Sequence, residues 1–138
     1  MFIVPALSLE DAYRATEAGR RKAEQMKVKV SIATVDQRGD IILLERMDGA
    51  GYLTPRIALG KAAAIALLKR PWQELEQRVR ENPVFYSGLT IVTHGDVLFG
   101  RGGVLVVKED QVVGGVGVSG GKSDEDETIA SEAVRAIG

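Results

Sequence analysis

The stretch from Gln111 to Arg135 constrains the fold most, because an apolar strand, a glycine-rich turn and a helix follow one another without interruption. Valines at positions 112, 113, 116 and 118 are typical of a buried strand, and Gly120 and Gly121 interrupt it. Ser123 then begins a helix with carboxylates in its first turn. Dehydrogenases, NTPases and serine hydrolases all have binding or catalytic residues at such a junction, so this stretch has three possible functional interpretations.

The dinucleotide-binding interpretation rests on Gly115, Gly117 and Gly120, which match the pattern G-x-G-x-x-G. Four successive carboxylates, Asp124 to Glu127, occupy the helix start that a pyrophosphate would need. No strand with an acidic residue about 20 positions later follows. The pattern therefore does not predict NAD or FAD binding.

The other two motifs fail on spacing and on order. A P-loop that ends in Gly121-Lys122-Ser123 needs a glycine where the chain has Val116. A nucleophile elbow around Ser119 needs a histidine later in the chain, and the single histidine, His94, precedes it. Ser119 is accordingly expected to be a small residue packed where a strand meets a helix.

Composition predicts one soluble domain over residues 1–138, with 45% apolar and 27% charged residues. A net charge of -1 with dispersed lysines and arginines excludes the electrostatic footprint of a nucleic-acid binder. The absence of cysteine excludes disulfides, thiolate metal sites and thiol catalysis. No apolar run reaches a membrane span and no signal peptide is recognisable, so a cytoplasmic location without a membrane partner is expected.

Periodicity predicts an α+β fold in the order α-β-β-α-α-β-β-β-α. The expected helices cover about residues 9–26, 55–70, 72–80 and from 123 onward. The expected strands cover about residues 28–35, 41–44, 89–93, 104–107 and 112–118, with an aromatic loop at 84–88. Two strand hairpins separated by helices favour a single antiparallel sheet with helices packed on it.

Two features of the middle of the chain are candidates for binding. Lys61 lies in an alanine-rich helix, where it needs either a carboxylate such as Asp48 or the carboxylate of a ligand. Arg101 is surrounded by Gly100, Gly102 and Gly103, which form either a cradle for a carboxylate or a bulge at a sheet edge. The sequence leaves both alternatives open.

Three blocks of residues are distinctive: Arg46-Met47-Asp48-Gly49-Ala50, the pair Gly102-Gly103 with the strand after it, and Gly115 to Gly121 with the acidic helix start. These blocks resemble the GlcG/HbpS family, a family of haem-binding or haem-degrading domains. The resemblance covers Leu9 to Ala136. It implies a profilin-like fold with a five-stranded antiparallel sheet and a homo-oligomer, possible sizes being a tetramer or an octamer. Haem or cobalamin is the implied cofactor, since some members bind haem and others accompany corrinoid enzymes.

This chain departs from the family pattern at two places. It has Asp40 where members commonly have His or Asn, and Val104-Leu105-Val106 where they commonly have a proline. The first departure removes one potential iron or metal ligand from the turn of the first hairpin.

The leading hypothesis is a small-ligand-binding protein that takes haem or a related tetrapyrrole near a subunit interface. Axial donors for haem iron are His94, Met47, Tyr52 and Tyr86. Arg46, Lys61 and Arg101 would form a charged rim for propionates. Gly102, Gly103 and Ser119 would allow the backbone to come close to the ligand. His94 is the preferred axial ligand.

Two alternatives remain. The same cluster could bind a small carboxylate in an enzyme or accessory protein, with Arg101 as the clamp and Asp48 or His94 as the proton carrier. The chain could also be an oligomeric scaffold without a ligand. Self-association is a separate expectation, motivated by the alanine-rich helix around Lys61 and the glycine-rich strand near Gly115. The helix is suited to lying either against a sheet or against a symmetry mate.

Overall fold

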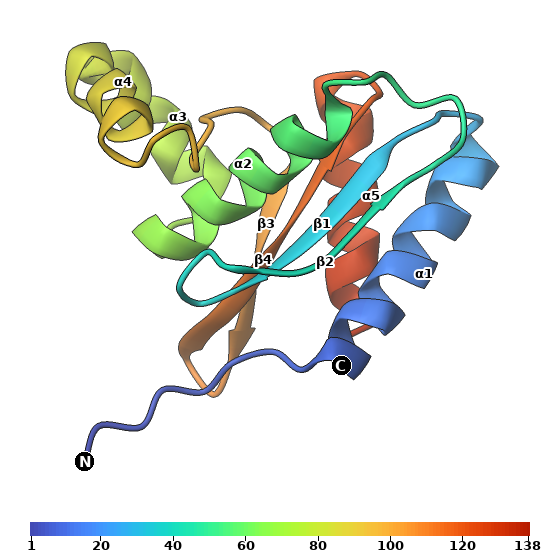
Figure 1. Cartoon of the computed structure of the whole chain (residues 1–138), viewed down its shortest axis with the longest axis horizontal. Helices are drawn as coiled ribbons and strands as arrows, with labels where there is room; N and C mark the ends of the chain where they lie inside the picture. The colour runs from blue at the N-terminus through green and yellow to red at the C-terminus, as the bar shows by residue number, and fades with distance from the viewer.

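A four-stranded antiparallel sheet forms the middle layer of the molecule in the computed structural model, which describes residues 1–138 (Figure 1). The strands run β2-β1-β4-β3 across the sheet. Their bounds are β1 Ser31–Asp36, β2 Ile41–Arg46, β3 Gly103–Lys108 and β4 Gln111–Ser119. The predicted antiparallel sheet is therefore confirmed, but it has four strands where five were expected.

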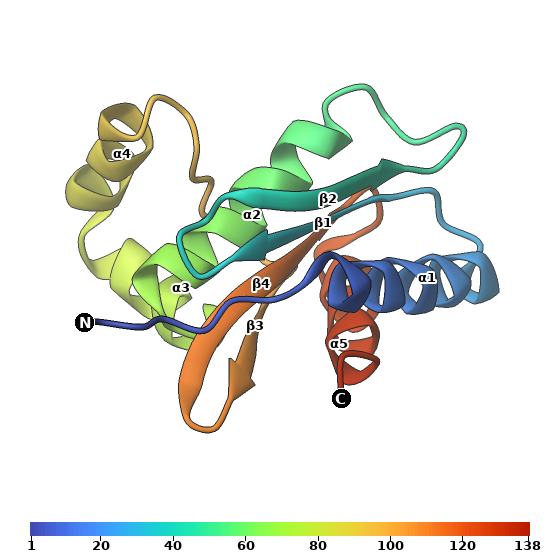
Figure 2. The ribbon, with the colours of Figure 1, turned by 60° about the horizontal axis from the view of Figure 1, so that its bottom comes forward.

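Helices cover both faces of this sheet (Figure 2). Helices α1 (Leu9–Met26) and α5 (Ser123–Arg135) lie on one face, and α2 (Thr54–Leu68) lies on the other. Two short helices, α3 (Trp72–Glu81) and α4 (Pro83–Val92), follow α2 at one end of the molecule. No helix combines the length and the apolar character that crossing a membrane would require.

Helix α4 replaces two predicted elements, the loop at 84–88 and the strand at 89–93. The element order is therefore α-β-β-α-α-α-β-β-α. Pro83 stands at the start of α4, where its fixed φ angle favours a helix. The apolar run Leu89-Thr90-Ile91-Val92 is too short for its periodicity to separate strand from helix.

The different residues on the two faces of β4 explain why its sequence matches a nucleotide-binding motif. Val116 and Val118 belong to the core beneath α1 and α5, together with Ile32 and Ile129. Each fully buried side chain of this size stabilises the fold by about 1.5–3 kcal/mol. Because strand side chains alternate between faces, Gly115 and Gly117 face α2. The alternation of glycine and valine is thus a packing pattern.

The glycine face of β4 and the alanine face of α2 lie in direct contact. A Cβ at Gly117 would stand 2.1 Å from the Ala58 carbonyl oxygen, and one at Gly115 would stand 3.0 Å from that of Ala62. Ala58, Ala62 and Ala66 are fully buried against the sheet. The alanine-rich helix therefore lies against the sheet of its own chain, one of its two expected positions, and these two surfaces are not available to join subunits.

Candidate functional site

The turn after β4 is closed by a buried ion pair between α2 and α5. Lys61 Nζ lies 3.2 Å from Asp126 Oδ2 and donates a hydrogen bond of 2.9 Å to the Val118 carbonyl. The lysine is only 7% exposed and the aspartate 3%. The predicted carboxylate partner of Lys61 exists, but it is Asp126 and not Asp48.

Two carboxylates of α5 occupy the amides that an anion would need at this turn. Asp126 Oδ1 accepts a hydrogen bond of 2.9 Å from the Gly121 N–H, and Glu125 accepts one of 2.8 Å from the Lys122 N–H. Burial raises the pKa of Asp126, although the Gly121 N–H and the Lys61 ammonium act in the opposite direction. The turn is thus filled by the chain's own carboxylates, which supports the rejection of the nucleotide-binding motifs.

The segment Arg101-Gly102-Gly103 is closely packed and offers no open cradle. Gly102 has a φ of +127°, and a Cβ there would lie 2.8 Å from the Val118 carbonyl oxygen and 2.9 Å from Lys61 Nζ. A Cβ at Gly103 would lie 2.7 Å from the Ile65 side chain. These glycines are required for packing around the ion pair.

Arg101 itself is paired with a neighbouring acid. Its guanidinium lies 3.1 Å from Glu127 Oε1, and this hydrogen bond raises the pKa of Arg101. Ser119, which is 6% exposed, lies opposite Ser31 of β1 at the end of the sheet. Of the predicted site, Lys61, Arg101, Gly102, Gly103 and Ser119 therefore surround a packed junction.

The loop between β2 and α2 forms a second and more open region. A pocket of about 410 Å³ is lined by Arg46, Asp48, Gly49, Ala50, Gly51 and Tyr52. The Arg46 guanidinium carbon lies 5.7 Å from the centre of the Tyr52 ring, a cation–π arrangement. Tyr52 is 86% exposed, and neither Arg46 nor Asp48 takes part in an ion pair. The structure thus brings Arg46, Asp48 and Tyr52 together.

His94 lies apart from both regions, directly after α4. Its φ is +55°, and its N–H donates to the Ile91 carbonyl, so the histidine ends the helix in a left-handed turn with Gly95. In Figures 1 and 2, α4 and the β2–α2 loop occupy opposite ends of the molecule. The four predicted groups Arg46, Tyr52, His94 and Arg101 therefore do not form one pocket.

Helix α4 exposes apolar side chains that were not expected to belong to a site. Val84, Phe85, Ile91 and Val92 are each more than half exposed, and α4 contains no charged residue. This set of four side chains is called the α4 apolar patch below. The sequence has an apolar run of helical length here, but this run was predicted as a loop followed by a strand, so the exposed patch was not foreseen.

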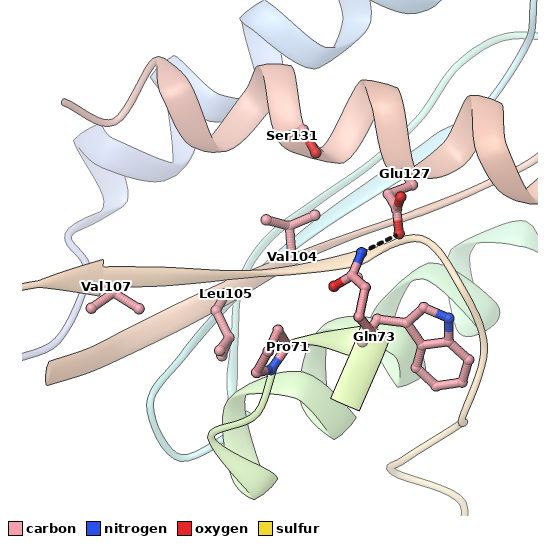
Figure 3. Close-up of a pocket in the computed structure, with 9 residues that line it drawn as sticks. Pro71, Gln73, Val104, Leu105, Val107, Glu127 and Ser131 are labelled. Carbon is pink, nitrogen blue, oxygen red and sulfur yellow. Dashed lines mark hydrogen bonds between the residues drawn. The ribbon is translucent and has the colours of Figure 1, made fainter. Parts of the chain in front are cut away.

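A further groove lies on the outer side of β3, between α3 and α5 (Figure 3). Its volume is about 520 Å³, and its lining residues are Pro71, Trp72, Gln73, Gly103, Val104, Leu105, Val107, Glu127 and Ser131. Gln73 donates a hydrogen bond of 3.4 Å to Glu127 across one end of this groove. Of its lining residues, only Gly103 was predicted to belong to a ligand site, because an open sheet edge has no local signature in the sequence.

Two of the predicted haem ligands are buried. Met47 and Tyr86 are each 9% exposed. Met47 belongs to the main core, and the Tyr86 ring packs edge-on against Phe85 and Phe99 at 5.2 and 5.3 Å. His94 and Tyr52 are the two candidate donors that remain at the surface.

Known proteins share this fold and much of this sequence. Residues 7–135 match the family described as haem degrading protein HbpS-like. Protein GlcG of Escherichia coli is 32% identical over 113 residues, which cover 82% of this chain and 81% of GlcG. The crystal structure of Klebsiella pneumoniae protein ORFY superposes with a TM-score of 0.89 at 31% identity, covering 99% of this chain and 94% of ORFY.

A crystal structure of a PduOC:heme complex is also similar, with a TM-score of 0.84 and 31% identity. The match covers 95% of this chain and 94% of that one. The shared blocks found in the sequence, the antiparallel sheet with its flanking helices, and these matches agree. The chain therefore belongs to the GlcG/HbpS family.

Proposed function

We propose that this protein binds haem or a related tetrapyrrole, with His94 as the iron ligand beside the α4 apolar patch. The observation that carries the proposal is the position of the single histidine, exposed after a helix that has four exposed apolar side chains and no charged residue. The similarity to a PduOC:heme complex and the match to the haem degrading HbpS-like family support it.

The residues around His94 fit the needs of a porphyrin. Haem requires an axial donor such as imidazole and apolar side chains against its ring. Ile91 and Val92, which are 77% and 68% exposed, directly precede the His94 turn. Bound haem would supply an iron centre for exchange of ligands or electrons, while this chain would hold it through His94 and shield it with α4. A corrinoid has a similar planar macrocycle and belongs to the same proposal.

The test is a titration of the purified chain with haemin, followed by its visible spectrum. We expect a saturable 1:1 Soret band for the wild type and at least a tenfold weaker affinity for His94→Ala. The matched control is Tyr52→Phe, which removes the other exposed donor and should leave the affinity within about twofold. Weak binding without saturation would overturn the proposal, and loss of binding in Tyr52→Phe alone would move the site to the β2–α2 loop.

A second candidate function is the binding of a small hydroxy or keto acid in the β2–α2 pocket. It is favoured by the unpaired Arg46 guanidinium, which lies in the same pocket as Asp48. Arginine binds carboxylates through two parallel hydrogen bonds, and Asp48 is available as a proton carrier. Arg46 therefore takes the clamp role that was expected of Arg101, whose guanidinium is paired with Glu127.

Calorimetry with a panel of hydroxy and keto acids tests this second candidate. We expect saturable binding that Arg46→Ala abolishes, with turnover lost in Asp48→Asn if the pocket is catalytic. Arg101→Ala is the matched arginine control and should retain binding. Binding that survives Arg46→Ala, or no binding by any acid of the panel, would contradict the candidate.

A further inference from the structure

The outer edge of β3 is an open strand edge. Because β3 pairs only with β4, alternate N–H and C=O groups on its other side have no backbone partner. The groove described above runs along this edge, with Val104 on one side of the strand and Leu105 and Val107 on the other as its apolar lining (Figure 3). An edge of this kind is a ready site for an added strand.

The opposite edge of the sheet is protected by charge. Strand β2 carries Glu45 and Arg46, and Glu45 is held 2.6 Å from Arg20 of α1. Strand β3 has one charged residue, Lys108, at its last position. Proteins commonly block free edges with charged side chains, so the contrast marks β3 as the edge left available.

The same chain has an uncovered apolar segment of matching size. Phe2, Ile3 and Val4 are 91%, 79% and 43% exposed, and Figure 1 shows the segment before α1 running away from the body. This segment, residues 1–5, is called the N-terminal arm. Phe2 to Val4 span ~10 Å when extended, which equals the length of the segment of β3 from Leu105 to Val107.

The arm is anchored on the far side of β4 from the groove. The Leu7 N–H donates to the Val113 carbonyl at 3.3 Å, and the Leu7 side chain lies near Gly114 and the Val35 carbonyl of β1. Strand β4 therefore lies between this anchor and β3. A strand added outside β3 would lie three strand spacings, ~14 Å, from this anchor. Phe2, Ile3 and Val4 are within five residues of Leu7, so they cannot both cross that distance and pair along the edge of their own chain.

We infer that the N-terminal arm of one copy pairs with the outer edge of β3 in a second copy. The arm adds a fifth strand in trans, and its apolar side chains fill the groove between α3 and α5. The Gln73–Glu127 hydrogen bond closes the end of the groove near the start of β3, so the arm lies along Leu105 to Val107. This contact between copies does not depend on haem.

The first experiment compares molar mass by light scattering over a range of protein concentrations. We expect concentration-dependent self-association that Val107→Lys weakens at least tenfold. The matched control is Ile41→Lys on the opposite edge, because Ile41 is 53% exposed and Val107 50%. The double variant Phe2→Ser/Ile3→Ser should weaken association as strongly as Val107→Lys, and far-ultraviolet circular dichroism should confirm that each variant is folded.

The second experiment traps the contact directly. The chain has no cysteine, so a chain with Ile3→Cys and an isotopically labelled chain with Val107→Cys form disulfides only through the introduced residues. We expect cross-linked peptides in which the thiol introduced in the arm of one copy is joined to the thiol introduced in β3 of the other. A monomer at every concentration would overturn the inference. The inference would also be overturned if Val107→Lys and the arm variant left association unchanged while Ile91→Ser/Val92→Ser abolished it. The α4 apolar patch would then be the contact between copies.

Discussion

The glycine-rich junction after β4 and the helix α4 place polar and apolar residues in opposite ways. At the junction, Lys61, Asp126 and Ser119 are buried, and the Lys61–Asp126 pair is satisfied by hydrogen bonds from other parts of the chain. On α4, apolar side chains stand in solvent and the single histidine follows them. A motif rich in functional residue types can therefore serve packing, while an ordinary apolar segment carries the exposed chemistry.

The largest effect is expected when the charge of Lys61 is removed from the junction. We expect Lys61→Met to lower the free energy of unfolding by about 3–5 kcal/mol at pH 7, because Asp126 is left as a buried, unpaired carboxylate. Urea unfolding measures the loss. The double variant Lys61→Met/Asp126→Leu removes both charges and should recover most of it, whereas a single variant as stable as the wild type would contradict a structural role for the pair.

The same variant should make stability depend on pH in a defined direction. Burial already raises the pKa of Asp126 above 3.8, and loss of Lys61 should raise it further. A carboxyl group that holds its proton more tightly when folded makes the free energy of unfolding fall as the pH rises through its two pKa values. The defect of Lys61→Met should therefore be smaller below pH ~3.8 than at pH 7; a defect that grows toward acid pH would contradict this account.

A smaller but still large effect is expected at the contact between β4 and α2. Gly117→Ala should lower the free energy of unfolding by about 3 kcal/mol, because its Cβ would stand 2.1 Å from the Ala58 carbonyl oxygen and 2.7 Å from the Ala62 nitrogen. Thermal and urea unfolding give the value. A tolerated alanine would show that Gly117 is present for another reason, such as approach of a ligand.

The smallest effect is expected on α4, and its sign is reversed. Gly88 lies within this helix, and no atom comes within 4 Å of a Cβ added there. Gly88→Ala should raise the free energy of unfolding by about 0.5–1 kcal/mol through helix propensity. Unchanged or lower stability in urea would mean that α4 is not helical in solution or that its surface is covered by another molecule.

Much of the fold could be predicted from the sequence, because its elements have clear periodicity. The first hairpin, the alanine-rich helix and the final strand, turn and helix are where the residues place them. The error at α4 arose from a short apolar run whose conformation depends on its start at Pro83 and on its packing against α3. Local patterns do not contain that tertiary information.

The candidate site could be predicted only in part. The need of Lys61 for a carboxylate followed from burial, but its partner lies 65 positions away, a separation that only the folded chain resolves. Arg46, Asp48 and Tyr52 are close in sequence and line one pocket, whereas His94 and Arg101 belong to other parts of the surface. The groove on β3 was missed because its lining comes from three separate elements.

A haemin titration of two variants shows whether the ligand binds at α4 or at the glycine-rich junction. We predict that Arg101→Ala, at the junction, keeps the wild-type affinity within about threefold, while His94→Ala weakens it at least tenfold. The reverse result, with binding lost in Arg101→Ala and retained in His94→Ala, would place the ligand at the junction and contradict the account.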